Sequence, residues 1–136
     1  MHYTIIESDE AGGSRFRDVS PPAEPTTAGA GGYPLLSSDP VAACAVVFAD
    51  VPAGLTRIEA HGPPQPQFVV VLSGTLRVEV TGAESRSFAP GSVVLAADVV
   101  GAGHVTRFSD GPCRLLLIPL DFPPGRRDTS LEVNRG

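Results

Sequence analysis

Two histidines and a glutamine have the chemistry to form a reactive pocket. His61 ends a stretch of alternating residues, and Gln67 opens a valine-rich stretch shortly after it. His104 follows Gly101 and Gly103, where the backbone can bend sharply and direct the imidazole back toward the other two. Imidazoles bind Zn, Fe, Ni or Cu, transfer protons near neutral pH and form hydrogen bonds. The two imidazoles are therefore candidates to act as acid and base, or to hydrogen-bond a ligand or each other with Gln67 as a partner.

Two charged residues share the strand parity of His61. Arg57 and Glu59 lie on the same face as His61 if the alternation of residues 55–61 is regular. Glu59 is then a candidate catalytic acid or base, or else a solvated carboxylate at the strand end. Arg57 is a candidate for binding a substrate carboxylate, or else pairs with another charge at the surface.

Three further residues have weaker positional support. Tyr33 lies in a segment rich in Pro and Gly, where it could close the mouth of a pocket and bind a ligand, or simply pack. Asp98 and Arg107 flank the segment that carries His104. We expect them to fix the geometry of that loop rather than to contact a substrate.

The elements that must position these side chains are β-strands. Period-two alternation, β-branched residues and frequent turn residues indicate a sandwich or barrel, and no window has a helical apolar stripe. The expected strands cover about 44–48, 55–61, 67–72, 76–80, 92–96, 105–108 and 114–120. Shorter strands are expected near 3–7 and 16–19. The sequence thus predicts an all-β chain.

The spacing of several residues resembles the motifs of the cupin superfamily. The first motif, G-x(5)-H-x-H-x(3,4)-E-x(6)-G, is matched by His61, Gln67 and Gly74, and Gly54 precedes His61 with one residue more than the motif has. Pro63 stands where that motif has its second histidine, and Gln67 stands where it has glutamate. The similarity covers about residues 41–121.

The second cupin motif, G-x(5)-P-x-G-x(2)-H-x(3)-N, is matched more loosely. Gly91 begins it, His104 occupies the histidine position, and Phe108 replaces the asparagine. Two additional residues follow Gly91. The resemblance implies a jelly-roll (double-stranded β-helix) cupin barrel.

The resemblance also implies a ligand set of His61, Gln67 and His104 for a divalent metal such as Zn, Fe, Ni or Mn. A neutral amide oxygen is a weak donor and removes one negative charge from such a site. A metal held by this set would bind less tightly than in a complete cupin site. It would keep positions open for water or substrate.

Composition limits the organisation and partners of the chain. It has 136 residues with a net charge of −5 and no basic run, which argues against nucleic acid and anionic membrane surfaces as partners. The N-terminus does not resemble a secretion signal and the apolar runs are too short to span a bilayer, so we expect a cytoplasmic protein. Cys44 and Cys113 are expected to be two buried free thiols, with a disulfide between them as the alternative. We expect a Pro/Gly-rich arm with short strands at 1–40, the barrel at 41–122 and a tail at 123–136. The arm further suggests a homodimer, in which it lies on a barrel or crosses to a partner.

Three functions fit these observations. The first is a bacterial isomerase or epimerase that moves a proton on an oxo acid or related metabolite, with metal assistance, and serves natural-product biosynthesis. His61, His104 and Glu59 would be its catalytic residues, and Gln67, Arg57 and Tyr33 its ligand-binding residues. The second is a non-haem iron oxygenase, although Gln67 does not supply the carboxylate or third histidine that such sites use. The third is a non-catalytic protein that binds a small molecule. Assignment by resemblance of fold does not choose among them, because one fold hosts many activities.

Overall fold

The computed structural model describes residues 1–26, 31–109 and 112–121, so the expected tail at 123–136 lies outside the described residues. Strands dominate this part of the chain, and the only helical element in it is the short 3-10 turn η1 (Thr81–Ala83). In the same ranges, no helix has the length and apolar character needed to cross a membrane. The prediction of an all-β chain is confirmed.

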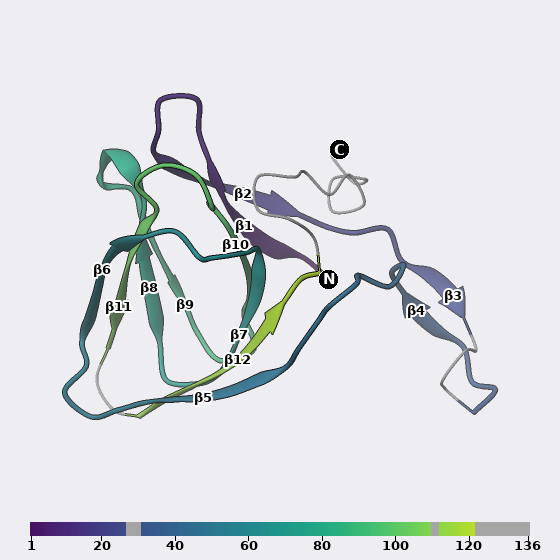
Figure 1. The fold of residues 1–136 in the computed structure, drawn as a ribbon. Helices are drawn as coiled ribbons and strands as arrows, with labels where there is room; N and C mark the ends of the chain where they lie inside the picture. Colours follow the sequence, from purple (N-terminus) through teal and green to yellow (C-terminus); the bar gives the residue numbers. More distant parts are fainter. Residues whose placement is uncertain (27–30, 110–111, 122–136) are drawn as a thin grey trace.

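The larger sheet has six strands in the order β2–β1–β10–β7–β12–β5 (Figure 1). These are β1 (Tyr3–Ser8), β2 (Ser14–Val19), β5 (Val47–Val51), β7 (Gln67–Ser73), β10 (Val93–Ala97) and β12 (Cys113–Pro119). β1 runs parallel to β10, and the other neighbouring strands are antiparallel. The central strands β10, β7 and β12 are rich in Val, Leu and Ile, which pack well on a pleated surface.

The smaller sheet has four strands in the order β6–β11–β8–β9. These are β6 (Arg57–His61), β8 (Leu76–Glu79), β9 (Ser85–Phe88) and β11 (His104–Phe108). The two sheets face each other in a jelly roll of the cupin type, as predicted (Figure 1). They are not closed into a barrel, because no hydrogen-bonded ladder joins them within the described ranges.

Two apolar clusters lie on opposite faces of the larger sheet. The inner cluster fills the space between the sheets, with Ile6, Val71, Val78 and Leu115 among its buried members. The outer cluster packs on the other face and includes Tyr3, Ile5, Val19, Leu95 and Leu120. Both clusters use residues of β1, and alternate residues of this strand point into each.

The N-terminal strands are integral to the larger sheet. β1 lies between β2 and β10, and Ile5 and Ile6 are both buried. The jelly roll therefore includes residues 3–19 as well as the expected 41–121. What extends from the body is a shorter arm after Val19, which carries the hairpin of β3 (Glu24–Thr26) and β4 (Leu35–Ser37) (Figure 1).

The two cysteines have different environments, and they are not bonded to each other. Cys113 is buried in the inner cluster, as expected, and burial raises the pKa of its thiol, which keeps it protonated. Cys44 is exposed, contrary to expectation. It precedes β5 rather than lying within that strand, so it is not covered by the opposite sheet.

Candidate functional site

A cavity of about 160 Å³ lies between the two sheets. Most of its wall is apolar, with side chains such as Ile6, Val78 and Leu117. Its polar lining residues are His61, Gln67, His104 and Thr106. The structure therefore brings the three residues singled out in the sequence to one cavity.

His61 reaches the cavity because the alternation of β6 is broken. His61 pairs with His104 on β11, but Ile58 pairs with Thr106, so β6 has one more residue than β11 between these pairs. Such a β-bulge places residues three apart on the same face. Ile58 and His61 consequently both line the cavity.

The same bulge keeps Arg57 and Glu59 out of the cavity, so the parity argument for these two residues fails. Arg57 Nε lies 2.9 Å from Glu59 Oε1, and the Glu59 side chain is 80% exposed. The hydrogen bond and charge of Arg57 lower the pKa of the Glu59 carboxyl, which is the opposite of what a general acid needs.

Glu59 contributes to the site through its backbone instead, because its carbonyl oxygen lies 2.9 Å from Nδ1 of His61. A carbonyl only accepts, so Nδ1 of His61 donates and Nε2 is the nitrogen left for a ligand.

His104 is held by a carboxylate that is fully buried. Its Nδ1 lies 2.7 Å from Oδ2 of Asp98, and the Asp98 side chain is 0% exposed. The same oxygen accepts a hydrogen bond of 2.8 Å from the hydroxyl of Ser14, which is also 3.1 Å from the carbonyl oxygen of Gly103. Asp98 Oδ1 is buried with no hydrogen-bond partner in the described part of the chain. This arrangement orients the ring and leaves Nε2 of His104 available on the cavity side.

Two glycines allow the loop before His104 to approach its neighbours. Gly101 and Gly103 both have positive φ, as the expected sharp bend requires. A Cβ at Gly103 would collide with the backbone of His61, and one at Gly101 would collide with the backbone of Gly12. Ala102 N–H donates to the carbonyl of Gly12 at 2.9 Å. The β1–β2 turn therefore supports the loop that carries His104.

Of the two predicted ligand-binding residues Gln67 and Tyr33, Gln67 lines the cavity and Tyr33 does not. Gln67 opens β7, is partly buried and lines the cavity, and its amide makes no hydrogen bond within the described ranges. Tyr33 lies on the arm and is 75% exposed, away from the lining of the cavity. The structure thus does not bring Tyr33 to the site. Arg107, expected to fix the His104 loop, instead pairs with Glu79 on the outside of the small sheet at 2.8 Å.

The donor set does not fit a tightly bound divalent metal. It consists of two imidazoles and one neutral amide, and Pro63, which also lines the cavity, offers no donor where the cupin motif has a histidine. The nearby carboxylate of Asp98 is committed to His104 and Ser14. No group of three His, Cys, Asp or Glu residues in the described chain is arranged to hold a metal. A divalent ion here would lack an anionic ligand in a mainly apolar cavity, which is unfavourable.

Ser14 also belongs to the site, through its hydrogen bond to Asp98, and was not predicted from the sequence. It lies 84 positions before Asp98, and a serine after a glycine-rich turn carries no signal of such a contact. Asp98 was expected to fix the loop. It does so by binding the histidine itself.

Comparisons with solved structures find similar proteins, but the TM-scores of the three described below are all under 0.5. No protein-family model matches the chain. No curated protein matches it in sequence. A protein from Neisseria meningitidis matches with 17% identity and a TM-score of 0.44, over 56% of this chain and 72% of that one.

Two further structures carry descriptions of an activity. DMSP lyase DddQ from Ruegeria pomeroyi matches with 26% identity and a TM-score of 0.46, over 71% of this chain and 49% of that one. The aligned part thus spans about half the length of the lyase. A candidate mannose-6-phosphate isomerase from Ralstonia eutropha matches with 17% identity and a TM-score of 0.37, over 90% of this chain and 86% of that one. With TM-scores below 0.5, these matches do not assign an activity to the chain. The structure itself establishes an all-β jelly roll of the cupin type with two histidines and a glutamine in one cavity.

Proposed function

We propose that this protein is an enzyme that moves a proton on a small carbonyl compound, as isomerases and epimerases do. His104 is the general base and His61 is the second acid–base group. The observation that carries the proposal is the buried Asp98 carboxylate 2.7 Å from Nδ1 of His104. A carboxylate in this position fixes the tautomer of the imidazole and stabilises the imidazolium that forms when Nε2 takes up a proton.

The second histidine, His61, can donate a proton to the substrate while His104 removes one. The ring centres of His61 and His104 are 6.0 Å apart, and each ring has its Nδ1 occupied by an acceptor. Both Nε2 atoms are therefore the reactive nitrogens. In an isomerisation, Nε2 of His104 removes the proton next to the carbonyl, and protonated His61 donates to the carbonyl oxygen. Returning a proton at a neighbouring carbon, or on the other face of the same carbon, completes the reaction.

The cavity favours a small and uncharged substrate. At about 160 Å³ it is smaller than the roughly 300–1,000 Å³ typical of pockets for drug-sized ligands. No arginine is among the described residues that line it, and the sequence has no lysine. A free carboxylate would find no arginine or lysine to pair with among these residues, so the oxo acid expected from the sequence is less well supported than a neutral aldehyde or ketone. Gln67 and Thr106 can hydrogen-bond polar groups of such a substrate.

The proposed proton transfer uses histidine side chains alone. The described donors of the cavity, two imidazoles and one neutral amide, do not form a complete set of metal ligands. For the same reason the site supports proton transfer better than iron-dependent oxygenation, which uses two histidines with a carboxylate or three histidines. A binding protein without activity remains the alternative outcome of the test below.

Hydrogen–deuterium exchange tests the proposal without knowledge of the product. Small aldehydes, ketones and 2-oxo acids are incubated with the protein in D₂O, and loss of the α-proton signal is followed by NMR. We expect catalysed exchange of at least one neutral carbonyl compound, with a loss of about 10²–10⁴-fold in His104→Ala. His2→Ala is the matched control, because His2 is exposed at the N-terminus and should leave the rate unchanged. Binding of these compounds without exchange above the uncatalysed rate would instead assign a non-catalytic binding function.

A further inference from the structure

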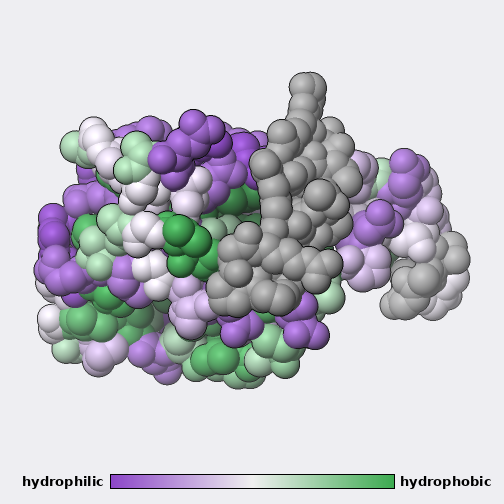
Figure 2. All heavy atoms as spheres, turned by 45° about the horizontal axis from the view of Figure 1, so that its top comes forward, coloured by the Kyte–Doolittle hydropathy of each residue, from purple (hydrophilic) through white to green (hydrophobic). Residues whose placement is uncertain are grey.

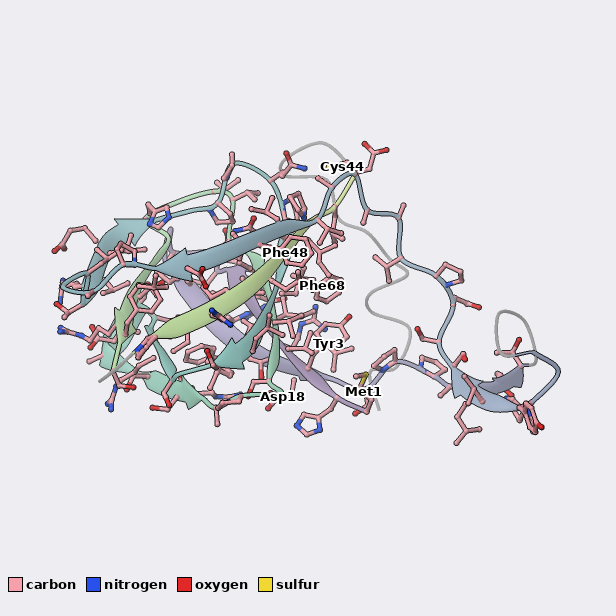
Figure 3. All side chains as sticks on the ribbon, turned by 90° about the horizontal axis from the view of Figure 1, so that it is seen from below. Met1, Tyr3, Asp18, Cys44, Phe48 and Phe68 are labelled. Atoms are coloured by element: carbon pink, nitrogen blue, oxygen red, sulfur yellow. The ribbon has the colours of Figure 1, made fainter. Side chains whose placement is uncertain are left out.

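The β3–β4 hairpin has exposed apolar side chains. Among the residues that the structure describes, its strands pair only with each other, and they stand away from the two sheets (Figures 1 and 3). Leu36 is 75% exposed, and Leu35 and Tyr33 are also exposed. An isolated two-stranded hairpin is marginally stable in water at best. The hairpin therefore needs an apolar surface to hold it.

The outer face of the larger sheet presents such a surface next to β5. A cross-strand row on this face runs from Phe48 on β5 through Leu116 and Val70 to Val93. Phe48 is 83% exposed, and Leu72 of β7 is exposed beside the row. We call these five residues the outer patch. Figure 2 shows that apolar residues also reach the surface in several places on the face that it views. A contiguous exposed apolar patch is typical of an interaction site.

A groove continues the outer patch toward the root of the arm. It has a volume of about 220 Å³ and includes Val70 and Val93, which also belong to the patch. Its floor further contains Tyr3 and Phe68, whose rings are 5.3 Å apart in an edge-to-face contact. Figure 3 shows Phe48, Phe68 and Tyr3 in succession across the larger sheet. The groove and the outer patch thus form one apolar surface on β5, β12, β7, β10 and β1.

The hairpin of the same chain does not fill this groove, because the ends of its own arm form the groove wall. Pro21, Pro22 and Pro40 line it where the arm leaves and rejoins the body. The hairpin lies beyond them and points away from the sheets (Figure 1). In addition, β5 is the end strand of the sheet, and end strands offer free backbone groups to a pairing partner.

We propose that the β3–β4 hairpin of one chain packs on the outer patch and groove of a second copy, and that the second copy returns the contact. Two identical chains related by a two-fold axis satisfy both exposed surfaces at once, because each supplies one hairpin and one patch. This gives the expected homodimer a defined interface. It is independent of the proton-transfer site, which opens between the sheets on the other face of the larger sheet.

Charge substitutions on the two surfaces test the proposal. Wild type should sediment at twice the 14.1 kDa chain mass. Leu36→Asp on the hairpin and Phe48→Asp on the patch should each weaken the dimer at least about tenfold, since both are exposed and neither supports the core. Val100→Asp is the matched control, an exposed apolar residue in the loop before His104, and should leave the dimer intact. Circular dichroism verifies that every variant is folded.

Cross-linking distinguishes a partner's hairpin from a rearranged arm of the same chain. A photoreactive p-benzoylphenylalanine replaces Leu36 in chains labelled with ¹⁵N, which are mixed with unlabelled chains. We expect mixed-isotope cross-links to peptides of β5, β7 or β12. A wild type that is monomeric at about 50 µM, a dimer unaffected by both aspartates, or cross-links only within single chains would overturn the proposal.

Discussion

Asp98 Oδ2 lies 2.7 Å from Nδ1 of His104 and 2.8 Å from the hydroxyl of Ser14, so one buried oxygen joins three separate parts of the fold. Ser14 begins β2, Asp98 follows β10, and His104 begins β11. The contact therefore links the N-terminal hairpin to the cavity between the sheets. It gives the β1–β2 hairpin a second role beside its part in the larger sheet.

Asp98→Asn tests whether this contact matters for the reaction. Asparagine has nearly the same shape, but its amide can turn a donor toward Nδ1 and favour the tautomer with the proton on Nε2. We expect kcat for the exchange reaction to fall by about 10–100-fold, with little change in KM. Steady-state rates by NMR give both constants. An unchanged kcat would show that the Asp98 carboxylate does not assist the reaction.

The sequence was informative where the spacing of its residues resembles that of the cupin motifs. His61, Gln67 and His104 could be singled out, because strand ends and positive-φ glycines bring them to one cavity. Glu59 was assigned wrongly to the same face as His61. A bulge leaves no mark in the alternation of 55–61, since the choice of which residue is extra depends on pairing with β11.

The contacts of Ser14 could not be predicted for a different reason. They depend on the parallel pairing of β1 with β10, a long-range feature that no local pattern encodes. Residues 3–19 had enough alternation to suggest short strands. Their position between β10 and the sheet edge follows only from the complete topology.

Gln67→Glu tests the role of the missing anionic ligand. Wild type should bind Zn²⁺ or Ni²⁺ weakly, and the glutamate should tighten binding at least about tenfold because it adds a negative charge to two imidazoles. Titration calorimetry measures both. Gln65→Glu is the control, because the Gln65 amide donates to the Leu120 carbonyl and does not line the cavity. Adding His104→Ala to Gln67→Glu should abolish the increase in metal affinity. Equal affinity in wild type and Gln67→Glu would mean that these residues do not converge on a metal.

Arg57→Gln tests the outward position of the β6 charges. Arg57 pairs with Glu59 on the outer face of β6, so its loss should leave KM for the exchange substrate within about twofold of wild type. The same kinetic assay used for Asp98→Asn provides the measurement. A large rise in KM would place Arg57 at the substrate, as the uninterrupted alternation had suggested.

Acid should weaken the N-terminal hairpin through Glu7. Burial alone would raise the pKa of this carboxyl, but hydrogen bonds from Arg17 and Arg15, with their charges, outweigh burial and lower it below the ordinary 4.5. The folded state thus binds the proton less readily than the unfolded state. The stabilisation is fully present above about pH 4.5 and is lost as the pH falls through the folded-state pKa.

Urea unfolding of Glu7→Gln measures this contribution. The variant should be less stable than wild type by about 1 kcal/mol at pH 7, and the difference should shrink below pH 4. Asp50→Asn is the control, because the Asp50–Arg114 pair is largely exposed and should contribute less. A difference that stays constant down to pH 3 would contradict the linkage.

The most direct test of the central claim is the protonation pattern of His104, because it needs no substrate. NMR of ¹⁵N-labelled protein distinguishes a protonated ring nitrogen from one with a free lone pair. In neutral His104 we predict a proton on Nδ1, directed at Asp98, and a lone pair on Nε2, with this pattern lost in Asp98→Asn. A neutral His104 that carries its proton on Nε2, unchanged by Asp98→Asn, would contradict the assignment of His104 as the base.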